Sequence, residues 1–174
     1  MTITDYLQSQ YKDAFDMIKF GETKNSILIA FNGAIIVGVS KLIADASNVY
    51  LYYFLLYIAG MCGISIFISF CALIAKITHS NQSLSLHKSS NLLYFGTLAH
   101  MTHEELLEKV RTQYGCTSVN SNHETDLAKQ VIITSQIAVR KFKLFNTAIA
   151  FTFSGLLTPV SLIIYKNFLD VNRP

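Results

Sequence analysis

Charge is scarce in this chain. Of its 174 residues, 14% are Asp, Glu, Lys or Arg and 51% are apolar. A soluble domain carries about 25% charged residues, so this chain has too little charge to cover a surface that faces water. Its mean hydropathy is +0.37. Proline and glycine are also few, at two and eight residues, which argues against a disordered chain or a loop-rich scaffold. The composition indicates a membrane protein.

Catalytic signatures are also missing. The sequence contains no P-loop, dinucleotide-binding, HExxH or GxSxG motif. The three cysteines show no CxxC spacing. His100 and His103, which two glutamates follow, come nearest to a metal cluster, but no clear third ligand accompanies them. The three long apolar runs of the chain contain no charged residue, which argues against an intramembrane acid–base enzyme. We therefore predict no catalytic residue, no metal site and no cofactor.

Three charge-free runs locate the membrane spans. The first is about 24 Å long as a helix, which is short of the roughly 30 Å hydrocarbon core. The lysines at both of its ends can extend their charges to the headgroups and make up the difference. The runs cover residues 25–40, 46–75 and 144–165. We predict transmembrane helices at residues 25–43, 49–75 and 144–165.

The positions of Lys and Arg predict the orientation in the membrane. Residues 76–143, between the second and third predicted spans, hold eight of them, and three more precede the first span. Between the first two charge-free runs there is only Lys41. By the positive-inside rule, the N-terminus and residues 76–143 are cytoplasmic, and the tail at residues 166–174 lies outside.

Residues 1–20 have the pattern of an amphipathic helix. Apolar residues recur at helical spacing, with charged residues on the opposite side. The apolar set is Ile3, Leu7, Tyr11, Ala14, Phe15 and Ile18. Gly21 follows and can act as a hinge before the first span. The helix either lies on the lipid headgroups or is a movable element that packs on the cytoplasmic region.

Capping boxes organise the cytoplasmic region, residues 76–143. Thr102 with Glu105 predicts the start of a short helix. A second box at Ser121 predicts another start, and no proline follows it before Pro159. We therefore expect one long helix that continues from the cytoplasmic region into the membrane.

Together these patterns predict the fold class. We expect an all-α membrane protein with an N-terminal amphipathic helix, three transmembrane helices and a helical cytoplasmic insertion between the second and third. Because three helices cannot enclose a conducting path alone, a pore requires an oligomer of this chain.

Uncharged polar residues form stripes on the predicted spans. The stripes are Asn25, Asn32 and Ser40 on the first span, Cys62, Ser65 and Ser69 on the second, and Thr147, Ser154, Thr158 and Ser161 on the third. One interpretation is hydrogen bonding between helices, with close approach at the Ala34/Gly38 and Ala59/Gly63 pairs. The other is a water-filled path in an oligomer. In that case the pore-lining candidates are Thr147, Ser154, Thr158, Ser161, Asn25 and Asn32.

Basic and aromatic residues near the cytoplasmic side of the membrane form a candidate binding site. Arg140, Lys141 and Lys143 either anchor the last helix to headgroups or form a basic collar in a ring of subunits. In the second case, Tyr94, Phe95 and Tyr114 add stacking surfaces. Basic groups beside aromatic rings hold nucleotides and short single strands. The net charge of +3 is too small to indicate a binder of duplex DNA. The candidate nucleotide-binding residues are Lys19, Lys24, Tyr94, Arg111, Arg140, Lys141 and Lys143.

Three short segments resemble the transmembrane effectors of bacterial nucleotide-signalling anti-phage systems, and the Pycsar effector family in particular. They are Phe20–Asn25 leading into Ile29–Gly33, Asn91–Gly96 followed by Glu104–Leu106, and the pair Lys141–Phe142. The chain is also similar to the membrane effector of the Hailong defence type, which short DNA oligomers hold closed. Where family members often carry Pro-Arg before the aromatic run, this chain has His87-Lys88-Ser89-Ser90.

The resemblance implies an oligomeric pore or ion channel in the bacterial inner membrane. Its ligand would be a cyclic nucleotide or short oligonucleotide made by a separate cyclase or nucleotidyltransferase. The expected partners are membrane lipid, further copies of the chain and this signal. Membrane disruption would then cause abortive infection. The alternative is an unregulated holin-like pore or a membrane-anchored scaffold, which has little use for a long cytoplasmic segment between its spans.

Overall fold

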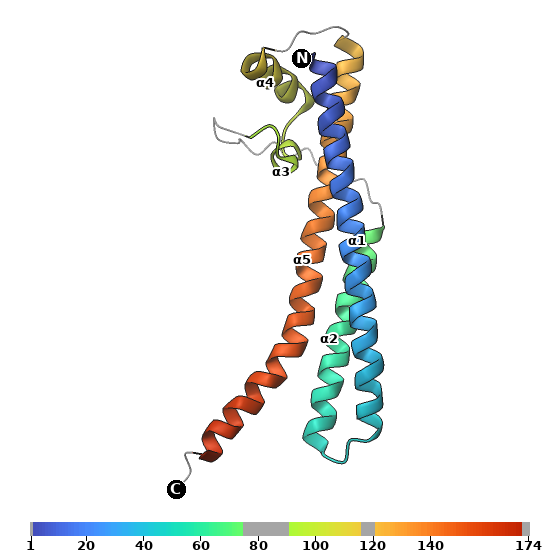
Figure 1. The fold of residues 1–174 in the computed structure, drawn as a ribbon, viewed down its shortest axis with the longest axis vertical. Coiled ribbons are helices and arrows are strands. Elements are labelled where there is room, and N and C mark those ends of the chain that lie inside the picture. The colour runs from blue at the N-terminus through green and yellow to red at the C-terminus, as the bar shows by residue number, and fades with distance from the viewer. Residues whose placement is uncertain (1, 75–90, 116–120, 172–174) are drawn as a thin grey trace. The chain divides into compact units, whose positions relative to one another are not determined.

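The described part of the chain is helical. The computed structural model describes residues 2–74, 91–115 and 121–171, without the side chains of residues 121 and 159–171. Its elements are α1 (Ile3–Ala44), α2 (Val49–Leu73), α3 (Phe95–Leu98), α4 (His103–Tyr114) and α5 (Ser121–Val171) (Figure 1). Every element within these ranges is a helix, which confirms the all-α prediction.

The chain divides into two compact units. Unit 1 contains Met1–Glu22 and Ile74–Lys143, and unit 2 contains Thr23–Leu73 and Leu144–Pro174. The long helices α1 and α5 each supply residues to both units. The predicted long helix that continues from the cytoplasmic region is therefore present as α5.

Helix α1 is continuous through Gly21, so it has no break at the predicted hinge between the amphipathic helix and the first span, and bending there stays a prediction. Gly21 is buried, and a Cβ built there would lie 3.4 Å from the Cβ of Lys141 on α5. A Cβ at this position would be in ordinary van der Waals contact with α5, so Gly21 lies where the two helices pack within unit 1.

The N-terminal part of α1 packs against protein. Its buried residues recur every three or four positions at Ile3, Leu7, Gln10 and Ala14, which is the spacing of helices that pack side by side. Tyr11 and Phe15, which we expected on the apolar face, are instead partly exposed. Protein therefore covers the part of the apolar face that contains Ile3, Leu7 and Ala14, and contact of the rest of this face with lipid headgroups stays a prediction. Movement of this helix stays a prediction.

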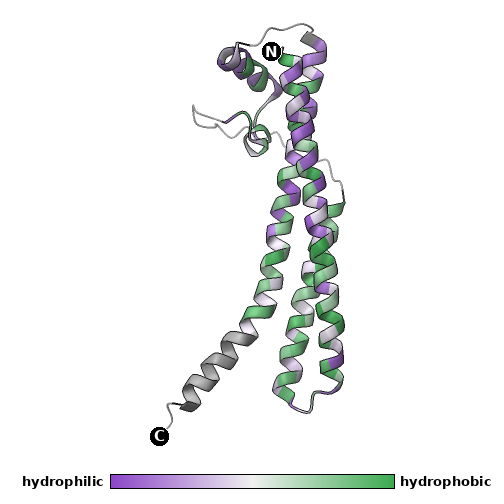
Figure 2. Cartoon of the chain, in the orientation of Figure 1, coloured by the Kyte–Doolittle hydropathy of each residue, from purple (hydrophilic) through white to green (hydrophobic). Residues whose placement is uncertain are grey.

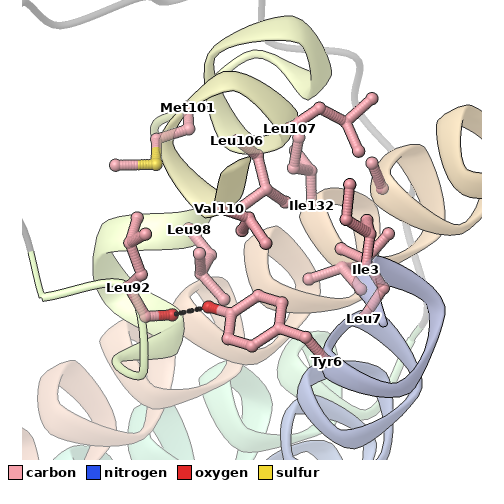
Figure 3. Packing of buried hydrophobic residues seen from close by; sticks show 12 residues of the cluster. Ile3, Tyr6, Leu7, Leu92, Leu98, Met101, Leu106, Leu107, Val110 and Ile132 are labelled. Carbon is pink, nitrogen blue, oxygen red and sulfur yellow. Dashed lines mark hydrogen bonds between the residues drawn. The ribbon is translucent and has the colours of Figure 1, made fainter. Parts of the chain in front are cut away.

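The core of unit 1 joins α1 to the other three helices of the unit (Figure 3). The Tyr6 hydroxyl points from α1 to the segment before α3 and donates a hydrogen bond to the Leu92 carbonyl at 2.7 Å. At the other end of α3, Gln136 Nε2 on α5 donates to the Ala99 carbonyl at 3.1 Å. These two bonds fix both ends of the four-residue helix α3. The apolar side chains of the core are those of Ile3, Leu7, Leu92, Leu98, Met101, Leu106, Leu107, Val110, Ala128, Val131 and Ile132, beside Tyr6.

Helix α4 has the predicted capping box. The Thr102 hydroxyl accepts the Glu105 backbone N–H at 3.2 Å, and the Glu105 carboxylate accepts the Thr102 N–H at 3.2 Å. The helix ends at Gly115, whose φ of +60° is left-handed, as glycine readily permits. Helix α5 begins at the predicted Ser121, although the Ser121 side chain lies outside the described residues.

A second capping box begins α1. The Thr2 hydroxyl accepts the Asp5 N–H at 3.1 Å, and Asp5 accepts the Thr2 N–H at 3.0 Å. Hydrogen bonds from the side chain and backbone of Thr2 lower the pKa of Asp5. Because the folded pKa is lowered, this cap stabilises the helix above the unfolded pKa, and its contribution is lost as pH falls through the folded value.

Unit 2 contains the apolar helices. Among the described residues, two helices are long and apolar enough to cross a membrane, α1 and α2. Apolar residues dominate α2 and the second half of α1, and polar residues the first part of α1 (Figure 2). Much of the third predicted span, residues 144–165, lies where side chains are not described, so the count of three spans stays a prediction.

The Tyr6 hydrogen bond generates a first test. Replacing Tyr6 with Phe leaves the buried Leu92 carbonyl without this donor and should destabilise the protein by about 1.5 kcal/mol. The thermal midpoint of the full chain in detergent should fall by about 4 °C. Tyr11→Phe is the matched control, since Tyr11 is partly exposed on the same helix. Equal midpoints for the two variants would contradict a structural role for this bond.

Candidate functional site

Three segments that are far apart in the sequence meet within unit 1. Phe20 on α1 and Phe95 on α3 both pack on Phe142 of α5, with ring centroids 6.1 and 5.8 Å apart. The Tyr94 ring follows at 5.0 Å from that of Phe95. We call these four residues the aromatic patch. The segments that carry the family resemblance thus converge on one site.

A glycine positions the outer ring of the aromatic patch. Tyr94 is the extended residue before α3, and its ring lies against Gly96. A Cβ at position 96 would overlap this ring, so only glycine leaves the ring in place. Tyr94 and Phe20 are about half exposed. The aromatic patch therefore presents ring surface to solvent, which is what base stacking requires.

A buried lysine lies next to the aromatic patch in the chain. Lys141 Nζ donates to Glu22 Oε1 at 2.9 Å, and the lysine side chain is 4% exposed against 46% for the glutamate. A buried ammonium is strongly unfavourable without an anion beside it. Glu22 provides that anion from α1, one residue after Gly21, which packs against Lys141. The ion pair thus ties the two long helices together.

The remaining basic candidates for nucleotide binding do not form a single cluster with Lys141 in the contacts described. Arg140 and Lys143, which flank Lys141 in the sequence, are half-buried and exposed. Lys19 pairs with Asp16 at 3.6 Å, and Arg111 lies 4.0 Å from the buried Glu124. Lys24 belongs to unit 2, where its ammonium lies 5.4 Å from the centre of the Phe145 ring. Of the seven candidates, Tyr94 belongs to the aromatic patch, and Lys141 directly precedes its member Phe142 in α5.

Sequence reasoning missed three residues of this site, which are Phe20, Glu22 and Phe142. All three stand within the segments that carry the resemblance, so the signal was present in the sequence. We considered basic residues and the aromatic residues of the cytoplasmic region, which overlooks the rings on the two long helices and the acidic partner of Lys141.

No group of three or more metal-ligating side chains occurs in the described ranges. Within the same ranges, His103 Nε2 lies 4.0 Å from Glu104 Oε1, and His100 is exposed. Neither arrangement resembles a closed tetrahedral site.

A buried polar network joins the three helices of unit 2. Asn32 on α1 donates through Nδ2 to Ser65 Oγ on α2 at 3.0 Å. The Thr152 hydroxyl on α5 lies 3.1 Å from Asn32 Oδ1 and 2.9 Å from Ser65 Oγ. All three side chains are buried. Since a hydroxyl has one hydrogen, Thr152 donates to one of these two oxygens at a time.

The pore-lining candidates fall into two groups. Asn25 and Asn32 are buried within the chain, whereas Thr147 and Thr158 are exposed. Ser154 is half-buried, and its hydroxyl lies 3.2 Å from that of Tyr57. Ser161 lies outside the described side chains. At Asn32, the interpretation as an interhelical hydrogen bond is the one that the geometry matches.

Two details of helix packing differ from expectation. We did not single out Thr152, although the series Ala148, Thr152 and Gly155 marks a face of small residues at helical spacing. Close approach occurs at Gly155, where a Cβ would lie 2.9 Å from the Cβ of Met61 on α2. At Gly38 and Gly63 a Cβ would meet nothing within 4 Å. The predicted close approach at those two glycines is therefore wrong within this chain.

These features define the class of the protein. It is a helical membrane protein whose aromatic and basic site lies on helices that continue into its apolar part. The family model described as Pycsar effector protein domain matches residues 6–166, and the chain belongs to this family. It is thus a transmembrane defence effector of the Pycsar type, the first of the two resemblances. Pycsar effectors act with a nucleotide signal that a separate cyclase makes. The comparisons with curated proteins and with solved structures gave no match.

The polar network generates a second test. Thr152→Val keeps the shape of the side chain but removes the hydroxyl, and should destabilise the protein by about 1 kcal/mol. The thermal midpoint in detergent should fall by about 3 °C. Thr158→Val, an exposed position on the same helix, is the matched control. A loss in the control as large as that in Thr152→Val would show that the network is not the cause.

Proposed function

We propose that this effector is a homo-oligomeric pore or ion channel in the bacterial inner membrane, controlled by a nucleotide or short oligonucleotide signal. Its opening disrupts the membrane and leads to abortive infection. The protein acts without catalysis of its own and without a cofactor. Membrane lipid, further copies of the chain and the cyclase-made signal are its partners, and duplex DNA is not.

The convergence of rings and a lysine in unit 1 is the observation that carries this proposal. Phe20, Tyr94, Phe95 and Phe142 present stacking surface, and Lys141 supplies a cation within the same short stretch of α5. Base stacking on aromatic rings combined with cations for phosphate is how many proteins bind nucleotides and single strands.

The unbroken long helices support control of the membrane part by a ligand. A signal bound at Phe20 or Lys141 contacts α1 and α5, and these same helices carry Asn32 and Thr152 in unit 2. A ligand shifts an equilibrium only if it binds the two states with different affinity. Because the ligand would contact both helices, its affinity would depend on how α1 and α5 are arranged.

Conduction requires several copies of the chain around an axis. Thr147 and Thr158 are exposed in the single chain, so they are available to line a path between copies. Neutral hydroxyl groups along such a path would discriminate poorly between ions. Collapse of the membrane potential is therefore the expected outcome of opening.

Liposome flux tests nucleotide control. The purified full chain should show ion flux that at least one member of a panel changes, the panel being the four common 3′,5′-cyclic mononucleotides and short deoxyoligonucleotides. Lys141→Gln should abolish this control, whereas Lys12→Gln, an exposed position on α1, should retain it. Flux that is constant across the panel would instead favour an unregulated holin-like pore.

Labelling from one side of the membrane tests the predicted orientation. Glu108 is exposed on α4 of unit 1, so a cysteine there, with the native cysteines replaced, is accessible to a membrane-impermeant thiol reagent. The positive-inside rule places residues 76–143 in the cytoplasm. We expect labelling only after the membrane is opened. Labelling of intact spheroplasts would overturn the topology.

A further inference from the structure

The ion pair between Lys141 and Glu22 is asymmetric. The cation is almost fully buried, at 4% exposed, while the anion is 46% exposed. The ammonium therefore needs an anion at its side, and the carboxylate can move into water at little cost. Such a pair holds a cation ready for exchange of its anionic partner.

Two other ion pairs in unit 1 lack this asymmetry. Asp16 and Lys19 are both exposed, at 54% and 62%, so water solvates each charge and their mutual attraction is small. In the pair of Arg111 with Glu124, the carboxylate is the buried member and the cation is 47% exposed. If an anionic ligand replaced Glu124 beside Arg111, the Glu124 carboxylate would either have to move into solvent or remain buried without a cation.

The surroundings of Lys141 favour a ligand that carries both phosphate and a base. Phe142, the next residue, belongs to the aromatic patch, and Tyr94 and Phe20 of this patch are half exposed. Inorganic anions would use the lysine alone. A nucleotide would use the lysine for its phosphate and the rings for its base.

We propose that a phosphate group of the nucleotide signal replaces the Glu22 carboxylate as the anion beside Lys141, with the base stacked on the aromatic patch. This proposal rests on the nucleotide control proposed above. It specifies the residues that bind the signal and the exchange of anions by which the signal binds. Glu22 is then a competitor within the chain that the signal must displace. When the ligand displaces Glu22, the ion pair of Glu22 with Lys141 is lost, and the ligand connects α1 to α5 in its place.

Glu22→Gln is the informative variant. It keeps the length of the side chain and a hydrogen-bond acceptor for Lys141 while it removes the competing charge. Binding of the effective nucleotide to the full chain in lipid nanodiscs should tighten about fivefold or more. Asp16→Asn, the matched control, removes the carboxylate beside the exposed Lys19 and should leave the affinity within about twofold. An unchanged or weaker affinity for Glu22→Gln, or an equal gain for Asp16→Asn, would overturn the proposal.

A double-mutant cycle separates exchange at Lys141 from a general effect of charge. If Glu22 acts through Lys141, then Glu22→Gln adds no affinity in a Lys141→Gln background. A gain that persists there contradicts the proposal.

Gly96→Ala offers a variant outside the ion pair, since it displaces the Tyr94 ring. It should weaken nucleotide binding several-fold and leave inorganic phosphate binding unchanged, and equal losses for both probes would contradict the stacking.

Inorganic phosphate distinguishes failure of this proposal from failure of the proposed function. If the wild-type chain binds no nucleotide of the panel, nucleotide control falls, yet tighter phosphate binding in Glu22→Gln would still support exchange at Lys141. If the wild-type chain binds a nucleotide but Glu22→Gln brings no gain for either probe, nucleotide control stands and the exchange is wrong.

Discussion

The continuity of α1 and α5 is the constraint on which the rest of this structure depends. Lipid offers no hydrogen-bond partner to the backbone, so a chain that passes from water into the membrane must satisfy its own N–H and C=O groups. An unbroken helix does this at every residue. The same two helices carry both the Lys141 site of unit 1 and the polar network around Asn32 in unit 2.

Polar side chains within the helix contacts set the register of each unit. In unit 2, Asn32, Ser65 and Thr152 are partners of one another, and a shift of one helix by a residue would leave them buried and unpaired. In unit 1, Tyr6 and Gln136 play the same part toward the ends of α3. Apolar contacts alone would tolerate several registers, whereas buried polar groups favour one.

Prediction from sequence succeeded where the cause is local. The capping box of Thr102 is an interaction across three residues, and its pattern predicted the start of α4. Prediction failed where several faces of a helix compete. Residues 1–20 offer two overlapping apolar faces, and the core of unit 1 takes the one with Tyr6 and leaves Tyr11 exposed. Gly21 likewise is a residue type that is common at hinges, but in the structure it packs against Lys141 on α5.

The sequence by itself determined that the chain is helical, that long stretches of it are apolar enough for a membrane, and which family it resembles. These properties follow from residue type and spacing, which a reader of the chain can sum directly. Only the tertiary structure decided that Glu22 is the partner of Lys141, that Thr152 joins Asn32 and Ser65, and that four rings form one patch. Such pairs are separated by as many as 120 positions, and their formation depends on the packing of whole helices, which no local pattern records.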